Sequence, residues 1–273
     1  MSLEEAGLLG EAEFELARRL IADYAGIKLS PHKRYMVHNR LSRRLRARGL
    51  ASFAEYLQRV QDDPAGERED FVNALTTNLT AFFREPHHFE LLRERAARHR
   101  ERSREPMRVW CSACSTGEEA WSIAMTLREA GCPAEVLATD IDTDALDTGV
   151  AGVYPHERAA HLPPDRLRAH FLRGVGPNAG RVNVRPELRP MVSFAQLNLL
   201  APAWPALGSF DAIFCRNVVI YFDREAQRRL LGRFAALLRP GALLAVGHAE
   251  SFPAGHPGFR ACGRTAYEFT GSA

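Results

Sequence analysis

The stretch from Arg108 to Leu127 carries the residue types best suited to holding a nucleotide-like ligand. Val109 to Ala113 is a short apolar run, Cys114 to Gly117 are small residues, and apolar residues then recur at helical spacing. This order predicts a strand, a tight turn and a helix. Small side chains in such a turn let a ligand approach the backbone, and the free N–H groups of the helix N-terminus face the same space. We therefore expect a ligand cradle, with Ala113 among its contacts.

Two acidic residues, Glu118 and Glu119, open the predicted helix. Carboxylates at this position favour the helix dipole but repel a pyrophosphate, so the preferred ligand is cationic or zwitterionic. The sulfonium and ammonium groups of S-adenosylmethionine fit this requirement better than NAD does. The alternative is that both glutamates only cap the helix.

Asp140 ends a second predicted strand, Glu135 to Thr139, about twenty residues after the turn. In a doubly wound fold, an acidic residue at the tip of the second strand holds the ribose hydroxyls of the bound nucleotide. Charge-assisted hydrogen bonds of this kind are worth roughly 1.5–3 kcal/mol. Asp140 is therefore a candidate for a large part of the cofactor affinity.

The elements that position these residues belong to a chain of 273 residues, of which 46% are apolar and 25% charged. This composition is typical of a soluble globular protein, and the length allows one ordinary domain with a smaller companion. The sequence contains neither an apolar run that spans a membrane nor a basic N-terminus leading into one. We therefore expect a cytoplasmic protein without direct membrane insertion.

Patterns that resemble metal sites are incomplete. Cys111 and Cys114 form a C-x-x-C pair, but no second pair or suitably spaced histidine completes a zinc set, so we expect reduced thiols. The run that starts at Asp140 lacks the glycine and glutamate that a calcium loop needs. Adjacent His87 and His88 project to different faces of a helix. The sequence therefore predicts no bound metal.

Residues from about Glu11 to Leu75 show helical spacing throughout and predict a small helical domain. Its second helix, Pro31 to Arg48, is rich in arginine. Such a helix can be a solvated face, a nucleic-acid surface or a dock for an acidic protein partner. No aromatic residues are interleaved with the arginines to stack on bases, which argues against nucleic acid. The polar run Thr76 to Leu92 is the predicted seam with the next domain, and ligand sites favour such seams.

After Asp140 the chain alternates strands and helices, with one interruption. Residues His161 to Arg189 break the rhythm and predict an inserted antiparallel hairpin lying over the main sheet. The further predicted strands are Met191–Leu197, Phe210–Cys215, Ala242–Val246 and Thr265–Phe269. Polar residues at the carboxyl ends of successive strands mark the ligand crevice of an open α/β sheet.

Several motifs occur in one consistent order: TTNLTAFFREPHHF, ACSTGEE, TDID, QLNLL, FDAIFCRNVVIYF and GHAESF. Together they resemble the CheR-type chemotaxis receptor methyltransferases, which use S-adenosylmethionine to methylate glutamate side chains of membrane chemoreceptors. The resemblance runs from about Phe14 to Phe269. It implies an α/β fold class: a Rossmann-like methyltransferase sheet at 77–273, an all-helical receptor-docking domain at 1–76, and a small β-subdomain inserted at about 174–190.

The resemblance also implies roles for individual residues. By position, the cofactor contacts are Asn78, Thr80, Arg84, Glu118, Asp140, Asn198, Leu199, Arg216 and Asn217, and the reacting centre holds Arg84 and Tyr221. The pair Ala120-Trp121 stands where the family usually has Pro-Tyr, which puts the packing near the cofactor in question. The expected product of the cofactor is S-adenosylhomocysteine.

A glutamate side chain has a reference pKa of about 4.3, so near neutral pH it is already an anionic nucleophile and needs no general base. The protein must strip its water and aim one oxygen at the methyl carbon, and orientation of this kind can supply roughly 7–11 kcal/mol. Arg84 can hold the carboxylate through its N–H fork, and Tyr221 can donate one further bond. The alternatives are a local ion pair for Arg84 and simple packing for Tyr221.

The expected partner is the acidic helical cytoplasmic region of membrane chemoreceptors. The candidate docking residues are Arg40, Arg43, Arg44, Arg46 and Arg48, which can steer an acidic helical bundle. A receptor tail peptide that binds at the β-subdomain is a further option that the sequence leaves open.

Two other classes of protein share the predicted cradle. A nucleic-acid methyltransferase ordinarily has an Asn/Asp-Pro-Pro-Tyr-like loop after the fourth strand, where this chain has Arg216-Asn217-Val218-Val219, so we expect no nucleic-acid partner. A non-catalytic signalling module would keep the fold without turnover. Retention of every candidate polar position argues against that class.

Overall fold

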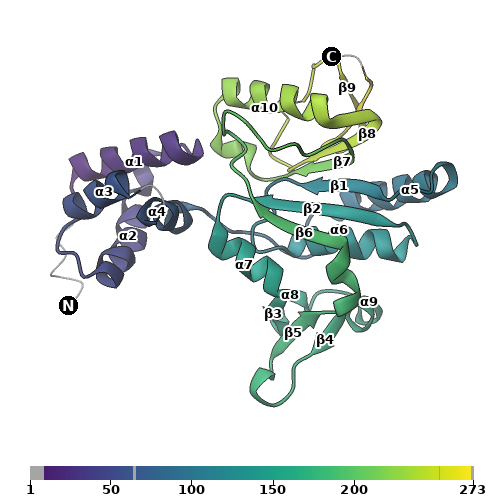
Figure 1. The fold of residues 1–273 in the computed structure, drawn as a ribbon, viewed down its shortest axis with the longest axis horizontal. Coiled ribbons are helices and arrows are strands. Elements are labelled where there is room, and N and C mark those ends of the chain that lie inside the picture. Colours follow the sequence, from purple (N-terminus) through teal and green to yellow (C-terminus); the bar gives the residue numbers. More distant parts are fainter. Residues whose placement is uncertain (1–8, 64–65, 252, 272–273) are drawn as a thin grey trace.

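The computed structural model describes residues 9–63, 66–251 and 253–271. A helical N-terminal domain lies beside a seven-stranded sheet, and a small three-stranded sheet extends from the same main domain (Figure 1). This architecture confirms the predicted fold class. Phe252 of the GHAESF motif, and the extreme residues of both predicted domains, lie outside the described part of the chain.

Within the described residues, four α-helices form the N-terminal domain and enclose a core of their own. They are α1 (Glu11–Ala25), α2 (Arg34–Arg48), α3 (Phe53–Asp62) and α4 (Glu67–Leu75), with a short 3-10 helix at Pro31–Lys33. Phe14, Leu41 and Tyr56 are fully buried in this core. The apolar spacing that predicted the helices therefore also marks the faces that pack together.

Five parallel strands form the centre of the main sheet. They are β1 (Met107–Cys111), β2 (Ala134–Asp140), β6 (Val192–Gln196), β7 (Phe210–Cys215) and β8 (Leu238–Val246). The order of strands in the sheet is β6-β2-β1-β7-β8-β10-β9. Strand β10 (Ala266–Phe269) is antiparallel to both of its neighbours, β8 and β9 (Phe259–Gly263). The chain moves outward from β1 in one direction and then returns to add β7 on its other side. That reversal creates a crevice at the carboxyl ends of β1 and β7.

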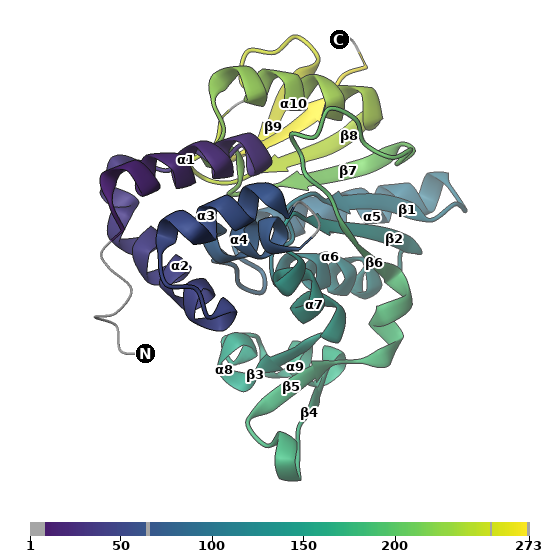
Figure 2. The same ribbon diagram turned by 60° about the vertical axis from the view of Figure 1, so that its left-hand side comes forward.

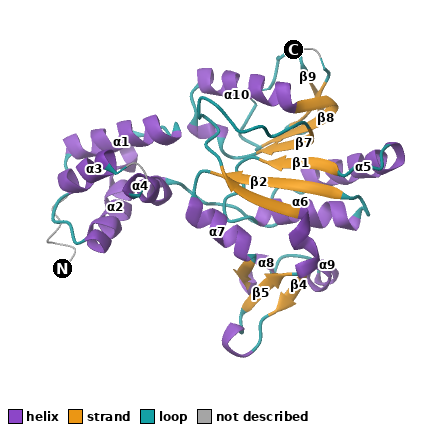
Figure 3. Ribbon diagram, in the orientation of Figure 1, coloured by secondary structure: helices purple, strands orange, loops and turns teal. Residues whose placement is uncertain are grey.

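Helices cover both faces of the sheet (Figure 3). The helices α5 (His87–Arg102), α6 (Glu118–Glu129) and α7 (Thr143–Ala151) contribute to one core, and α10 (Arg224–Leu237) to the other. Trp110 and Phe234 are fully buried in the second core with their rings 5.4 Å apart. A sheet buried on both faces explains why its central strands are almost continuously apolar.

The inserted subdomain is larger than predicted. Its strands β3 (Val153–Pro155), β5 (Arg181–Val184) and β4 (Phe171–Arg173) form a three-stranded antiparallel sheet, accompanied by α8 (His156–Ala159) and α9 (Pro164–His170). The predicted range of 174–190 is therefore too short, because a strand of three residues shows no period that a sequence pattern can detect. The subdomain extends away from the main sheet instead of lying over it (Figure 1). Phe82 joins the two parts, with its ring 5.2 Å from that of Phe171.

Two further differences concern the end of the chain. Strand β9 was not predicted, because most of its side chains are at least partly exposed and give no apolar pattern. Strand β8 begins at Leu238 rather than Ala242.

All five cysteines have free thiols, as predicted. None of the helices in the described part of the chain has the length and apolar character that crossing a bilayer requires.

Candidate active site

A cavity of about 290 Å³ lies between the N-terminal domain and the carboxyl edge of the sheet. Figure 2 shows the N-terminal helices in front of this edge. The cavity brings together almost all of the predicted site residues: Asn78, Thr80, Arg84, Ala113, Asp140, Asn198, Leu199, Arg216, Asn217 and Tyr221. Lys28, Lys33 and Met36 of the N-terminal domain also line it. Sequence patterns did not identify these three, because they belong to a different domain and match no ligand motif.

The predicted cradle is a tight turn with unusual backbone geometry. Ser115 and Gly117 have φ angles of +49° and +92°, in the region where L side chains are disfavoured. A Cβ atom at Gly117 would lie 2.7 Å from the Cα atom of Gly149, so the turn also needs glycine for space. This tight turn follows Ser112 and Ala113, and both of these residues line the cavity together with Ser115.

Asp140 fixes the cradle from the second strand. Its Oδ2 atom accepts a hydrogen bond from the Ser115 N–H at 2.7 Å, and its Oδ1 atom accepts one from the Asp142 N–H at 3.1 Å. Burial raises the pKa of the Asp140 carboxyl, while these backbone hydrogen bonds oppose that effect. Since each carboxylate oxygen has two lone pairs, both can still accept a bond from a ligand hydroxyl.

Asp142 connects the seam segment to the cradle, although sequence reasoning did not select it. It is buried and caps α7 by accepting from the Ala145 N–H at 3.0 Å. It also accepts from the Asn78 amide at 2.6 Å, and the Oδ1 atom of Asn78 in turn accepts from the Ser115 hydroxyl at 2.8 Å. The position before the helix was a detectable capping signal. The hydrogen bond between Asp142 and Asn78 was not detectable, because the two residues are more than sixty positions apart in the sequence.

Glu119, not Glu118, faces the cavity. Glu119 lines it and accepts a hydrogen bond from the buried Arg216 guanidinium at 2.6 Å. Burial raises the pKa of Glu119, and the Arg216 charge opposes this. Glu118 is fully buried outside the lining, where it pairs with Arg158 at 2.9 Å. Consecutive residues project about 100° apart on a helix, so the two glutamates point in different directions and only Glu119 lines the cavity. A cofactor contact for Glu118 stays a prediction.

Arg84 and Tyr221 both line the cavity, Arg84 from the loop before α5 and Tyr221 from the end of a short 3-10 helix, Val219–Tyr221. The Arg84 side chain donates to the carbonyl of Leu79 at 2.8 Å, within its own loop, and its backbone carbonyl accepts from Arg216 at 2.6 Å. The Tyr221 carbonyl accepts from the Lys28 N–H at 3.2 Å. The two candidates for the reacting centre are thus tied to the cofactor side and to the N-terminal domain respectively.

Three non-glycine residues near these loops adopt left-handed backbone geometry. The φ angles are +54° at Phe83, +59° at Glu85 and +58° at Asn217. Such geometry costs roughly 1–3 kcal/mol at each position and persists only where surrounding contacts enforce it. Strained residues therefore lie on both sides of Arg84 and directly after Arg216.

Asn198 lines the cavity, and its side chain also has partners within the protein. The amide nitrogen donates to the carbonyl of Tyr24 at 2.8 Å, and the amide oxygen accepts from the Leu200 N–H at 2.8 Å. Asn198 therefore joins the sheet to α1 of the N-terminal domain. Trp121 lies outside the lining and donates to the Gly149 carbonyl at 3.1 Å.

His87 and His88 lie closer together than the prediction from helix faces allowed. Their ring centroids are 4.1 Å apart, and both rings contact the backbone of residues 264–265. With Glu85 they offer ligand atoms within 4.8 Å of one another, so the argument from opposite faces was wrong. Arg216 lies 3.4 Å from Glu85, and burial followed by the Arg216 charge lowers the pKa of His88 to about 4. This positive surrounding disfavours a cation, and the absence of a metal stays a prediction.

Two of the five predicted docking arginines are committed to the N-terminal domain itself. Arg44 pairs with the fully buried Glu67 at 2.9 Å and also with Asp70, and Arg48 pairs with the same two carboxylates. Sequence reasoning treated all arginines of α2 alike, because Glu67 had no feature that predicted its burial. Arg44 and Arg48 therefore stabilise the helix packing.

The other three arginines differ among themselves. The Arg40 side chain donates to the backbone carbonyls of Ala74 and Thr76, where the N-terminal domain ends. Arg46 donates from Nε to the carbonyl of Ser42 on its own helix at 3.3 Å. Arg43 and Arg46 are both exposed, and among the described residues no ion pair engages either guanidinium, so they are the best placed of the five to meet a partner.

Comparison with known proteins identifies the family of the chain. Residues 12–76 match the model of the CheR methyltransferase all-alpha domain, and residues 78–267 match the CheR methyltransferase SAM binding domain. Chemotaxis protein methyltransferase 2 of Pseudomonas aeruginosa is 50% identical over 259 residues, which cover 93% of this chain and 92% of the relative. Chemotaxis protein methyltransferase of Escherichia coli is 48% identical over 272 residues, which cover 98% and 94%. The chain therefore belongs to the CheR family of S-adenosylmethionine-dependent chemotaxis protein methyltransferases.

Proposed function

We propose that the cavity holds S-adenosylmethionine against the cradle and receives a glutamate side chain of a chemoreceptor at Arg84 and Tyr221. The bound cofactor supplies an activated methyl group, and the products are a glutamate methyl ester and S-adenosylhomocysteine. One observation carries this assignment: a single cavity contains the cradle, Asp140 and both candidates for the reacting centre.

The residues of the cavity fit the cofactor chemically. The carboxylate of Asp140 lines the cavity and retains lone pairs for the ribose hydroxyls. Glu119 supplies negative charge on the cavity wall, which suits a ligand with sulfonium and ammonium groups. Ala113 leaves space for the ligand beside the backbone. We propose that Glu119 has the electrostatic role that the sequence suggested for the pair Glu118-Glu119, and that Asn78, Thr80, Leu199, Arg216 and Asn217 are further contacts.

The protein acts on the receptor carboxylate chiefly by positioning it. The carboxylate is ionised near neutral pH, so its oxygen can attack without a base. Arg84 can bind it through two N–H groups and Tyr221 through its hydroxyl, which restricts its orientation. Tight hydrogen bonds would also lower its nucleophilicity. We therefore expect the two residues to orient the carboxylate and displace its water rather than to activate it.

Receptor docking is the finer part of the proposal. Arg43 and Arg46 are the proposed contacts for the acidic helical cytoplasmic region of a chemoreceptor, and Arg40, Arg44 and Arg48 maintain the surface that carries them. This partner places the enzyme in the cytoplasm. The small β-subdomain remains a proposed site for a receptor tail peptide.

Methyl transfer can be tested directly with labelled S-adenosylmethionine and a purified receptor cytoplasmic fragment. We expect base-labile label on the fragment, as a methyl ester requires, and a lower kcat for Tyr221→Phe because the variant cannot donate the hydroxyl hydrogen bond. Tyr267→Phe on β10, which does not line the cavity, is the matched control. Label that resists base, or equal kcat in all three proteins, would contradict the assignment.

A further inference from the structure

The loop after β8 contains a buried carboxylate that the roles assigned so far do not use. Glu250 is 4% exposed. Its Oε2 atom accepts from the Gly247 N–H at 2.7 Å and the Asn217 N–H at 2.8 Å, and its Oε1 atom accepts from the Val219 N–H at 2.9 Å. Every hydrogen-bond donor that meets it in the described part of the chain is a backbone amide. A buried charge is tolerated because these three donors replace its water.

Two of the three amides belong to the loop that follows β7. This loop carries Arg216 and Asn217 on the cofactor side and Tyr221 at the reacting centre. The carboxylate bridges the N–H groups of residues 217 and 219 with its two oxygens, so it fixes the backbone between them. Asn217 has a φ angle of +58° within this bridged segment. The carboxylate is therefore a contact that can enforce an otherwise unfavourable backbone conformation.

Gly247 shows how closely the two loops approach. A Cβ atom there would lie 2.4 Å from the Asn217 Nδ2 atom, 2.8 Å from the Asn217 backbone nitrogen and 2.8 Å from the Glu250 Oε2 atom. No side chain can be accommodated without moving one of these groups. The end of β8 and the loop after β7 are thus in direct contact through Glu250.

We infer that Glu250 is a positioning residue for methyl transfer. Its carboxylate holds residues 217–219 so that Asn217 faces the cofactor and Tyr221 faces the receptor carboxylate. An ionised carboxylate suits this task because it only accepts hydrogen bonds. A glutamine would have a single oxygen for three N–H groups and would direct its own NH₂ group toward one of them. This inference rests on the proposed function of the same cavity.

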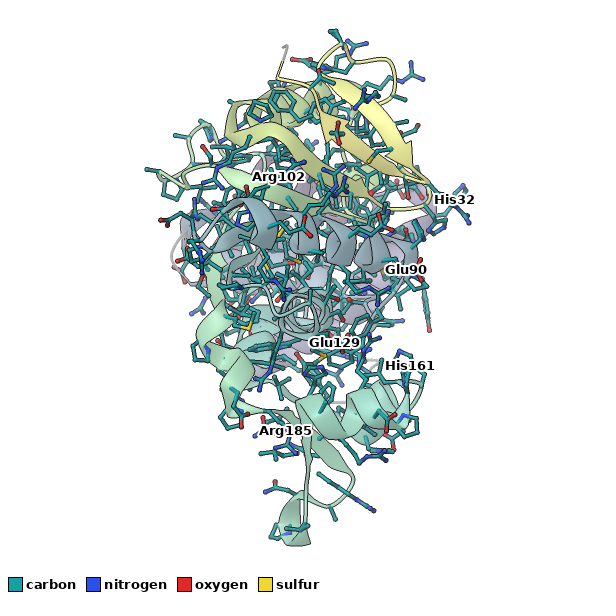
Figure 4. All side chains as sticks on the ribbon, turned by 90° about the vertical axis from the view of Figure 1, so that its right-hand side faces the viewer. His32, Glu90, Arg102, Glu129, His161 and Arg185 are labelled. Atoms are coloured by element: carbon teal, nitrogen blue, oxygen red, sulfur yellow. The ribbon has the colours of Figure 1, made fainter. Side chains whose placement is uncertain are left out.

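The test compares Glu250→Gln with Glu129→Gln. Glu129 pairs with Arg166 and His170 at 2.6 and 2.9 Å on the side of the molecule that faces the inserted subdomain, as Figure 4 shows. It does not line the cavity. Both variants lose a hydrogen-bonded carboxylate, so the control reports the general effect of destabilisation. The measurements are Tm, the Kd for S-adenosylhomocysteine, and kcat and KM with the receptor fragment well below both Tm values.

For Glu250→Gln we expect kcat to fall about tenfold or more, as the loss of one hydrogen bond to a charged group predicts. For Glu129→Gln we expect an unchanged kcat at a similar loss of Tm. Gly247→Ala disturbs the same contact while keeping the carboxylate, and it carries the test if Glu250→Gln does not fold. We expect it to lower kcat as well.

A kcat of Glu250→Gln within twofold of wild type, or an equal loss of kcat in Glu129→Gln, would overturn the inference while leaving the proposed function intact. If Glu250→Gln does not fold and Gly247→Ala keeps its kcat, the inference is overturned in the same way. A wild-type protein that transfers no methyl group would overturn both.

Discussion

Replacing Asp140 by asparagine is the most direct test of the cofactor site. The substitution preserves the size of the side chain and removes its charge. In the structure both carboxylate oxygens accept backbone N–H bonds, at 2.7 Å from Ser115 and 3.1 Å from Asp142. The asparagine must therefore direct its NH₂ group toward one of these N–H groups, and it also loses acceptor capacity for the ribose. We expect weaker cofactor binding through both effects.

The size of the effect follows from the bonds that are lost. Hydrogen bonds to a charged group contribute about 1.5–3 kcal/mol, which corresponds to roughly 10- to 150-fold in Kd. The Asp140 carboxyl would contribute less if it were protonated in the free protein, since burial raises its pKa. The opposing backbone hydrogen bonds favour the ionised form. We therefore expect Asp140→Asn to weaken S-adenosylhomocysteine binding by at least tenfold.

Calorimetric titration with S-adenosylmethionine and S-adenosylhomocysteine measures this directly. Asp211→Asn is a suitable control, because Asp211 also accepts a backbone N–H bond, from Arg108 at 2.8 Å, but lies outside the cofactor cavity. The control should bind both ligands with the affinity of wild type. If Asp140→Asn binds as tightly as the control, Asp140 does not hold the ribose and the orientation proposed for the cofactor is wrong.

Reversing Arg43 and Arg46 to glutamate should raise KM for the receptor fragment and flatten its dependence on salt, whereas unchanged kinetics would refute their role in docking. Arg44→Gln should instead lower stability by about 1.5–3 kcal/mol, the worth of a hydrogen bond to a charged group, because Arg48 still pairs with the buried Glu67; urea unfolding can measure this, and a loss below 1 kcal/mol would contradict the described ion pair. Burial favours a higher pKa for Glu129, but hydrogen bonds from His170 and Arg166 hold it at about 2, below its ordinary value of 4.5. The stability that this depressed pKa provides is present above pH 4.5 and is lost as the pH falls toward 2, so Glu129→Gln should cost about 1–2 kcal/mol at pH 7, after allowance for solvent screening, and much less near pH 2. A difference from wild type that does not change with pH would refute this assignment.

Local patterns predicted the central strands and the polar residues at their ends, whereas Asn78, Thr80 and Arg84 followed only from the resemblance to the family. A parallel strand buried on both faces is a continuous apolar run, and its carboxyl end is marked by the first polar residues after it. Asp140, Arg216 and Asn217 were found in this way, and chain topology brings those strand ends to one edge. The short strand β3 lacked any such pattern, and the inserted subdomain was therefore placed too late in the chain.

The roles of individual charged side chains were harder to predict, because each depends on a tertiary partner. Glu118 and Glu119 are identical in type and adjacent, and only the positions of Arg158 and Arg216 distinguish the one outside the cavity from the one that lines it. Glu250 was missed for a related reason. Its partners are backbone amides, and a sequence has no residue type that marks a free N–H group.

Under the proposed function, the contacts between the two domains connect receptor docking to the chemistry. The Lys28 N–H donates to the carbonyl of Tyr221, and the Asn198 amide donates to the carbonyl of Tyr24. These bonds join the N-terminal domain to the segments that we propose hold the receptor carboxylate and the cofactor. A receptor bound at Arg43 and Arg46 therefore contacts a domain whose position is already fixed relative to Tyr221. Part of the orientation that methyl transfer requires is then established before the glutamate enters the cavity, which reduces the entropy that must be lost in the reacting complex.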